Sequence, residues 1–270
     1  MSKIENYLES LFSLEGKVIL LTGAAGGIGR AFAEGLAAAG GSVAMCDIDY
    51  QNCEEIAEEL RHTGMSAKPY ELDISNHNSI KKCVAAVLSD YKKIDVLVNC
   101  AGINKREGIL DVEEETYDKI MDINLKGAFL LSQEVVKHMI TRKQGNIINI
   151  GSHNDEGMLG GCSVYGAAKS GLRALTRSMA IEWAKHGIRA NSLSPGHFIT
   201  PLTTVTWEHP TRSEYLKKRI AMQRPGTPKE LVGICIMLAS DASSYMTGQA
   251  YHVDGGYLCG GNPWEFDTNY

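Results

Sequence analysis

A short apolar run followed at once by a glycine-rich turn constrains this chain more than any other feature. The run Lys17–Thr22 (KVILLT) is typical of a buried strand, and the turn Gly23–Gly29 leads into an alanine-rich segment. Glycines at 23, 27 and 29 let the backbone turn tightly and approach a ligand. The helix that follows presents free N–H groups and a positive dipole end. Because the turn follows the first strand, we expect a pyrophosphate site here rather than a merely flexible connection.

Runs typical of strands alternate with helical segments along the whole chain. This alternation predicts an α/β fold of Rossmann type, a single-domain doubly wound parallel sheet with helices on both faces. The expected strands are 17–22, 42–47, 67–73, 94–100, 145–150, 188–194 and 250–253, and the expected helices are 28–39, 50–62, 76–91, 114–141, 163–186 and 228–239.

Three units are expected along the chain: an N-terminal arm over 1–14, one domain over 15–257 and an aromatic tail over 258–270. Residues 197–226 contain prolines and lack a strand pattern, so we expect them to form a mobile lid over a site.

Composition excludes several classes of protein. A chain of 270 residues with 44% hydrophobic residues can bury a core without disulfides or metals. The net charge of −5 disfavours nucleic acid as a partner, and the lack of a long apolar run predicts no membrane span. Seven irregularly spaced cysteines, with no pair at metal-binding spacing, indicate free thiols in a reducing compartment. We therefore expect a cytoplasmic protein without a metal site.

Asp47 ends the second expected strand, eighteen residues beyond Gly29. A carboxylate at this position can accept hydrogen bonds from both hydroxyls of an adenosine ribose and would repel a 2′-phosphate. Lys and Arg are absent from residues 46–53. This pattern predicts NAD rather than NADP as cofactor. The alternative is that Asp47 only caps the helix that begins near residue 50.

Tyr165 and Lys169 stand four residues apart in the stretch GCSVYGAAKS and would share one face of a helix. A tyrosine titrates near pH ~10, but a nearby ammonium and a cationic nicotinamide ring would lower its pKa. We therefore expect Tyr165 to act as the acid or base in proton transfer, rather than as a core or interface tyrosine. A nucleophilic triad within residues 152–155 is disfavoured because adjacent residues rarely form one and a G-x-S-x-G elbow is lacking.

Together these motifs resemble the short-chain dehydrogenase/reductase family over about residues 15–257. The resemblance rests on TGxxxGxG at Thr22–Gly29, NCAG at Asn99–Gly102, DINL around Asn124, Ser152 thirteen residues before Tyr165 of YxxxK, and PGxxxT at Pro195–Thr200. Cys100 stands where the family has a second Asn. This difference puts little of the expected cofactor binding in doubt, because the backbone makes much of the contact with the cofactor at this position.

The resemblance implies hydride transfer between a nicotinamide cofactor and a secondary alcohol or ketone. Ser152 would orient the reacting oxygen, Asn124 would hold a water, and Lys169 would bind the nicotinamide ribose beside Tyr165. Asp73 would bind the adenine amine and Thr200 the carboxamide, while Asn99 and Ala101 would line the adenosine ribose. The implied cofactor-binding residues are Gly23, Gly27, Ile28, Gly29, Asp47, Asp73, Ile74, Asn99, Ala101, Gly102, Tyr165, Lys169, Pro195, Gly196 and Thr200.

Candidate substrate residues lie on segments expected near the same site. Arg106 follows the fourth strand and is a candidate for bidentate pairing with a carboxylate, a solvated surface charge being the alternative. Polar and aromatic residues on neighbouring loops predict a polar pocket. These residues are His153, Asn154, His197 and Trp207.

Residues 103–106 and the later helices resemble the branch of the family that includes gluconate 5-dehydrogenases and deoxygluconate dehydrogenases. This implies a polyol or a sugar acid such as gluconate as substrate. One alternative is a 3-oxoacyl-thioester reductase, which Asp47 disfavours because such enzymes usually use NADP. Another is a non-catalytic dinucleotide-binding sensor or scaffold, which the intact catalytic set disfavours. The resemblance also implies a homotetramer. We expect the tail residues Trp264, Phe266 and Tyr270 to reach a neighbouring subunit and help close a site, a disordered end being the alternative.

Overall fold

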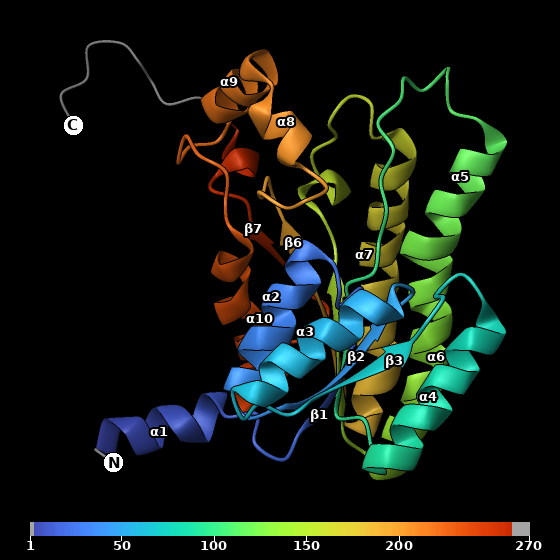
Figure 1. Cartoon of the computed structure of the whole chain (residues 1–270), viewed down its shortest axis with the longest axis vertical. Coiled ribbons are helices and arrows are strands. Elements are labelled where there is room, and N and C mark those ends of the chain that lie inside the picture. Colours follow the sequence, from blue (N-terminus) through green and yellow to red (C-terminus); the bar gives the residue numbers. More distant parts are fainter. Residues whose placement is uncertain (1–2, 261–270) are drawn as a thin grey trace.

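The computed structural model of the chain describes residues 3–260, in which seven strands form one parallel sheet in the order β3-β2-β1-β4-β5-β6-β7 (Figure 1). The order reverses between β1 and β4, as in a doubly wound sheet. The strands are β1 Val18–Thr22, β2 Ser42–Asp47, β3 Ala67–Glu71, β4 Val96–Asn99, β5 Gly145–Ile150, β6 Ile188–Pro195 and β7 Ala250–Val253. This confirms the predicted fold class.

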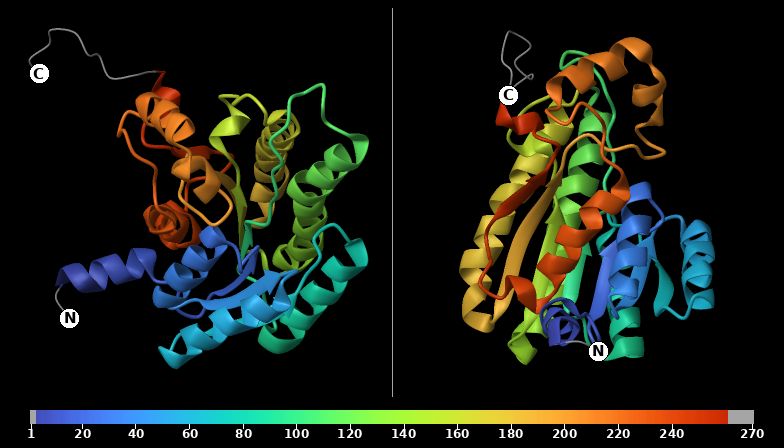
Figure 2. Two further views of the ribbon diagram at one scale, coloured as in Figure 1. Left: turned by 45° about the horizontal axis from the view of Figure 1, so that its top comes forward. Right: turned by 90° about the vertical axis from the view of Figure 1, so that its left-hand side faces the viewer.

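Helices cover both faces of the sheet (Figure 2). One hydrophobic cluster joins α2, α3 and α10 to one face, and a second joins α4, α6 and α7 to the other. All residues of β1, β4 and β5 are buried, as expected for strands covered on both sides. The helices are α1 Lys3–Phe12, α2 Gly27–Ala38, α3 Tyr50–His62, α4 His77–Tyr91, α5 Glu114–Met121, α6 Ala128–Arg142, α7 Ser163–Trp183, α8 Thr204–Glu208, α9 Pro210–Arg219 and α10 Val232–Ala239.

The long helix expected over 114–141 is not one regular helix. The chain forms α5, then a π-helical segment at Asp122–Gly127, and then α6. The wider turn brings Asn124 below the carboxyl ends of the strands, where it is buried. Likewise, the helix expected over 163–186 ends as α7 at Trp183 and continues as one 3₁₀ turn, Ala184–His186.

Residues 197–226 contain α8 and α9, which lie above the carboxyl ends of the strands (Figure 1). A single isolated bridge, Phe198 to Gly226, ties the two ends of this segment together. The mobility expected of this lid stays a prediction. Leu14, the last residue of the expected arm, is fully buried in the cluster that contains α2. The aromatic tail residues from 261 onward lie outside the described residues.

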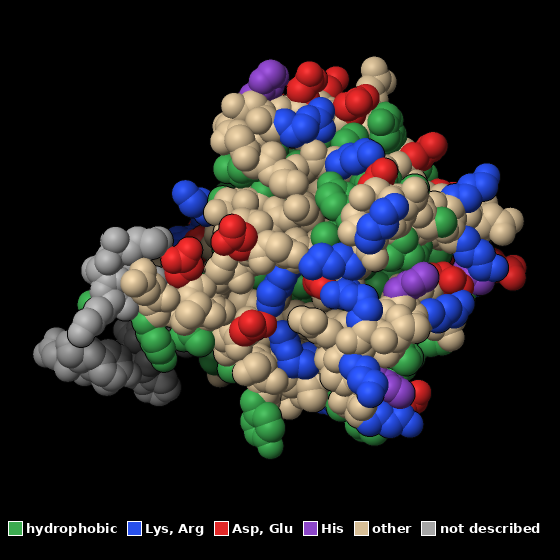
Figure 3. Space-filling model, turned by 90° about the horizontal axis from the view of Figure 1, so that it is seen from below, with side chains coloured by type: hydrophobic (Ala, Val, Ile, Leu, Met, Phe, Trp, Pro, Cys, Tyr) green, Lys and Arg blue, Asp and Glu red, His purple; other side chains and the backbone are tan. Residues whose placement is uncertain are grey.

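The opposite edge of the sheet carries the amino ends of the strands. Lys and Arg side chains spread over the middle of this face, with Asp and Glu side chains around them (Figure 3). Among residues 3–260, helices of the length and apolarity needed to cross a bilayer are absent.

Candidate functional site

The carboxyl ends of the central strands open into a cleft of about 670 Å³ beneath α8. Most of the predicted site residues line it, whereas Asn99 and Asn124 are buried and lie outside its lining. The predicted residues that line the cleft are Gly23, Gly27, Ile28, Gly29, Asp47, Asp73, Ile74, Ala101, Gly102, Arg106, Ser152, His153, Asn154, Tyr165, Lys169, Pro195, Gly196, His197, Thr200 and Trp207.

The glycine-rich turn needs its glycines for steric reasons. Gly23 has a φ of +66°, and a Cβ there would lie 2.8 Å from the Cα of Ala101. A Cβ on Gly29 would overlap the carbonyl oxygen of Gly23. The turn therefore packs closely on the segment after β4 and leaves the amino end of α2 facing the cleft. This geometry fits an anionic group bound at a helix terminus.

Asp47 fixes the edge of this turn. Its Oδ2 accepts a hydrogen bond from the Ala25 N–H at 2.9 Å, and its Oδ1 accepts from the Asp49 N–H at 3.0 Å. The helix α3 is capped by Asp49, whose side chain accepts from the Asn52 N–H at 3.2 Å. The alternative that Asp47 caps this helix is therefore excluded, and its carboxylate lines the cleft.

The segment after β4 is held by hydrogen bonds from two sides. The Thr22 hydroxyl accepts from the N–H groups of Cys100 and Ala101, both at 3.0 Å. Asn99 instead turns its amide inward and donates to Ser132 at 3.0 Å and to Asn149 at 2.8 Å. The side chain of Asn99 thus supports the floor of the cleft from below rather than lining it, which differs from its expected place beside the ribose.

The pair on α7 lies as the spacing predicts. The Lys169 Nζ is 5.7 Å from the centre of the Tyr165 ring and donates to the Ile150 carbonyl at 2.7 Å. Ser152 follows β5 on the same side of the cleft, and its Oγ accepts from the Asn154 N–H at 3.2 Å. Tyr165, Lys169 and Ser152 therefore line one common space.

Burial dominates the ionisation of both groups on α7. It raises the pKa of Tyr165 to about 12, partly opposed by hydrogen bonding with Ser152. It lowers the pKa of Lys169 to about 8, partly opposed by Cys100 and the Asp155 carboxylate. The expected lowering of the Tyr165 pKa thus does not come from the chain alone, because desolvation of the phenolate outweighs the neighbouring groups.

Asn124 is held from the π-helical segment. Its Nδ2 donates to the carbonyls of Ile103 and Ile120, both at 2.9 Å, while its buried Oδ1 lacks a partner among residues 3–260. A Cβ on Gly102 would lie 2.6 Å from this Oδ1 and 3.5 Å from the Lys169 Nζ. The glycine therefore keeps open the space between the amide oxygen and the ammonium group.

The other end of the cleft gathers the candidate substrate residues. The rings of His153 and His197 have centres 4.5 Å apart, and Trp207 meets His197 edge-on at 6.2 Å. Arg106 donates to the Thr206 hydroxyl of α8 at 3.2 Å and so bridges the cleft to the lid segment. Both histidines have lowered pKa values because they are buried, and that of His197 falls to about 3.

Sequence analysis missed two residues of this region. Tyr257, in the turn after β7, meets the rings of His153 and His197 at 4.9 and 4.8 Å. Asp155 carries a buried carboxylate that accepts from Ser194 at 2.6 Å and lies 3.1 Å from His252. A single isolated tyrosine gives no sequence signal. Asp155 does stand in the stretch 152–155, where the sequence disfavours a triad, and its carboxylate instead contacts Ser194 of β6 and His252 of β7.

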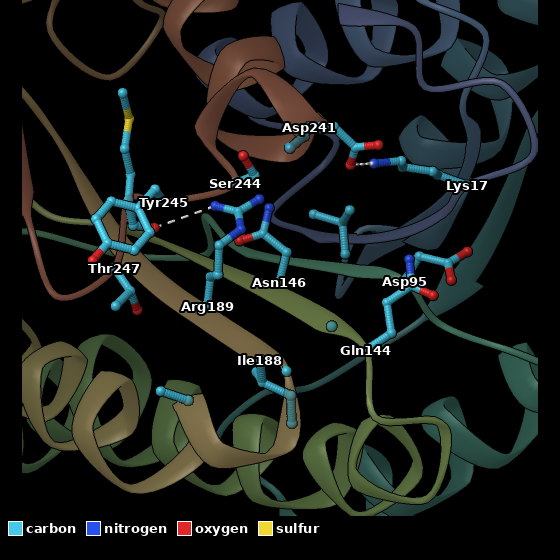
Figure 4. A pocket seen from close by; sticks show the side chains of 16 residues that line it. Lys17, Asp95, Gln144, Asn146, Ile188, Arg189, Asp241, Ser244, Tyr245 and Thr247 are labelled. Carbon is cyan, nitrogen blue, oxygen red and sulfur yellow. Dashed lines mark hydrogen bonds and ion pairs between the residues drawn. The ribbon is translucent and has the colours of Figure 1, made fainter. Parts of the chain in front are cut away.

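A second hollow of about 550 Å³ lies at the amino ends of β4, β5 and β6 (Figure 4). Arg189 donates there to the carbonyls of Leu238 and Ser240, both at 3.2 Å. At its rim Lys17 pairs with Asp241 at 2.7 Å. These charges are satisfied within the chain, and the catalytic candidates lie at the opposite edge of the sheet. The first cleft is therefore the candidate active site.

Known proteins resemble the chain over nearly its whole length. A family model described as enoyl-(acyl carrier protein) reductase matches residues 23–258. The 5-keto-D-gluconate 5-reductase of Escherichia coli is 37% identical over 251 residues, covering 93% of this chain and 99% of that protein. The 3-oxoacyl-[acyl-carrier-protein] reductase FabG of Thermotoga maritima is 39% identical over 247 residues, covering 91% and 99%.

A solved structure agrees with this match. A gluconate 5-dehydrogenase from Burkholderia cenocepacia, in complex with NADP and tartrate, has a TM-score of 0.91 at 36% identity and covers 93% of this chain and 99% of that one. The glycine-rich turn, Ser152 and the pair on α7 occupy one cleft in this fold. The chain belongs to the short-chain dehydrogenase/reductase family.

Proposed function

We propose that the protein interconverts a secondary alcohol and a ketone in a sugar acid or polyol, using a nicotinamide dinucleotide. The observation that carries the proposal is the convergence of Ser152, Tyr165 and Lys169 at one end of the cleft whose other wall is the glycine-rich turn. The names of the relatives in gluconate metabolism support a sugar acid.

The residues of the chain fit a dinucleotide. The glycine positions where a Cβ would collide form a cradle for a pyrophosphate, and Asp47 lies at its edge. A bound oxidised nicotinamide would supply the hydride acceptor and a positive charge that favours the Tyr165 phenolate. Lys169 also favours the phenolate, so that Tyr165 takes the hydroxyl proton of the alcohol during oxidation and returns it in reduction.

Ser152 donates a hydrogen bond to the reacting oxygen and holds it next to the phenol. Asn124 offers its Oδ1, which has no partner among residues 3–260, to a water that connects the Lys169 ammonium with solvent. Although burial lowers the pKa of Lys169 to about 8, its ammonium group stays largely protonated near neutral pH.

We propose NAD as the preferred cofactor. Each oxygen of the Asp47 carboxylate accepts one backbone N–H and keeps a lone pair for a ribose hydroxyl. Asp49 adds a second negative charge to the same cleft wall. The Burkholderia cenocepacia relative holds NADP, so direct titration of this protein with both dinucleotides is the deciding measurement.

The test of the activity is nicotinamide absorbance during oxidation of gluconate and a polyol panel, with wild type and Tyr165→Phe side by side. We expect the variant to lose ~10²- to 10⁴-fold in kcat, as removal of a general acid or base does. Reduction of a 3-oxoacyl thioester tests the alternative that FabG represents, which the charged Arg106 and the polar ring nitrogens of the cleft disfavour. The absence of turnover with every substrate would favour a non-catalytic sensor.

Residues 197–226 act as the lid in this proposal, because α8 contributes Thr206 to the contact with Arg106 across the cleft. We expect amide hydrogen exchange in this segment to slow when NAD and gluconate are added.

We further propose a cytoplasmic homotetramer. All seven cysteines are free thiols, which suits a reducing compartment. Leu110, Ile181 and Tyr245 are large apolar side chains exposed on the single chain. Light scattering of the purified protein measures its mass in solution, and deletion of residues 261–270 tests whether the tail contributes to assembly.

A further inference from the structure

Two histidines form a wall of the cleft beside the catalytic serine. His153 follows Ser152 directly in the 3₁₀ turn His153–Asp155, and His197 follows the end of β6. The two residues are 4% and 9% exposed, and both line the cleft. This wall therefore faces whatever occupies the space next to the reacting carbon.

Within residues 3–260, His197 Nε2 has no hydrogen-bond partner, and the ring nitrogens of His153 have no well-aligned partner although the Pro195 carbonyl lies close enough to favour protonation of that ring. A buried polar atom left unpaired costs about 1–3 kcal/mol, so water or a ligand in the cleft completes the bonding of these nitrogens. Tyr257 meets both rings edge-on and restricts their rotation, which holds the nitrogens in place.

The charge state of the wall selects the kind of ligand. Burial keeps both rings neutral. At His153 this effect outweighs the Pro195 carbonyl and the carboxylates of Asp254 and Asp155, which favour the protonated ring. At His197, the cations Arg106 and Arg219 add to the effect of burial. A neutral imidazole offers one donor and one acceptor, as a hydroxyl group does, whereas a carboxylate can only accept.

We infer that His153 and His197 form a binding site for a substrate hydroxyl adjacent to the reacting carbon, and that the substrate carboxylate lies toward Arg106. This inference rests on the proposed function and states which end of the proposed substrate lies at the histidines and which lies toward Arg106. A hydroxyl-free acyl chain would leave the ring nitrogens unpaired and is therefore rejected.

The kinetic test compares propylene glycol with isopropanol, a matched pair in which only the first carries a hydroxyl beside the secondary alcohol. In His197→Phe, which keeps a planar ring and removes the nitrogens, we expect the ratio of kcat/KM values for the two alcohols to fall ~10- to 100-fold. The control variant Tyr245→Phe, at the opposite edge of the sheet, keeps the wild-type ratio. Equal losses on both alcohols would indicate a structural role and overturn the inference.

A second measurement does not need turnover. The NAD complex of Tyr165→Phe is titrated with glycerol, gluconate or isopropanol while the imidazole NMR signals are followed, and the His197 signal is identified by its loss in His197→Phe. Shifts with glycerol but not with isopropanol support the hydroxyl site even if wild type fails to oxidise gluconate, in which case only the proposed sugar acid is wrong. Gluconate turnover without any imidazole shift overturns the hydroxyl site alone.

Discussion

The loss of stability in acid reports how strongly the folded protein disfavours the protonated form of His197. Burial, aided by His153 and Arg106, lowers its pKa from 6.5 to about 3 in the folded protein. The unfolded chain binds a proton near the ordinary pKa of about 6.5, so this residue does not affect stability well above that pH. As the pH falls from about 6.5 toward 3, His197 becomes protonated in the unfolded state but stays neutral in the folded state. The free energy of unfolding therefore decreases.

The size of the effect follows from the two pKa values. At a pH of about 5 the unfolded state is favoured by about 2 kcal/mol through His197 alone, whereas near neutral pH the contribution is close to zero. His153 has a lowered pKa for the same reason and adds in the same direction. A loss of this size is a large part of the stability of an ordinary domain.

The assay is urea unfolding of wild type and His197→Phe at a pH near 7.5 and at a pH near 5. The change of unfolding free energy between the two pH values should be about 2 kcal/mol smaller in the variant. Taking the difference between proteins cancels the titration of the carboxylates that both share. His62→Gln, at an exposed histidine, should behave as wild type. Identical pH dependence in wild type and His197→Phe would refute the claim that the ring is buried in its neutral form.

Three further substitutions have expected results. Gly29→Ala should abolish NAD binding in calorimetry without unfolding the protein, because its Cβ would overlap the Gly23 carbonyl; retained affinity would show that the turn can shift. Asp47→Ala should lower the preference for NAD over NADP by ~10- to 100-fold, since it removes a charge that repels the 2′-phosphate. An unchanged ratio of dissociation constants would mean that another residue selects the cofactor. Asp155→Asn should cost about 1–3 kcal/mol in unfolding free energy, because Ser194 and His252 lose a buried charged acceptor, whereas Arg173 keeps Glu156 at 2.8 Å. A loss below about 1 kcal/mol, measured by the same urea unfolding, would show that a neutral amide serves as well as the carboxylate at this position.

The doubly wound parallel sheet and the edge of the sheet that carries the cleft could be predicted because they rest on local signals. The apolar run that ends at Thr22 and the glycine turn after it define a strand and a helix terminus within a few residues. Strand–helix alternation and right-handed crossovers then leave few topologies. The carboxyl ends of the strands meet at one edge in such a sheet, so the residues that follow them converge.

Features that depend on burial could not be predicted from the sequence. The pKa of Tyr165 reflects how far the fold removes the phenol from water, which a spacing of four residues does not reveal. Tyr257 contacts His153 and His197 although about a hundred and about sixty residues separate them along the chain. Such contacts depend on three loops meeting at one point, and a lone tyrosine in a glycine-rich turn looks the same with or without them.

The π-helical segment shows how the motif around Asn124 predicted a residue near the site but not the local structure that holds it. Asn124 was assigned from the motif DINL, whose residues suit a regular helix and give no sign of an extra residue in the turn. A regular helix advances about 100° for each residue, so one inserted residue redirects the side chains beside it. In the wider turn the Asn124 amide reaches both the Ile120 carbonyl of its own helix and the Ile103 carbonyl after β4. The irregularity thus fixes the amide between helix and sheet with its oxygen toward Gly102, where a water beside Lys169 would be bound.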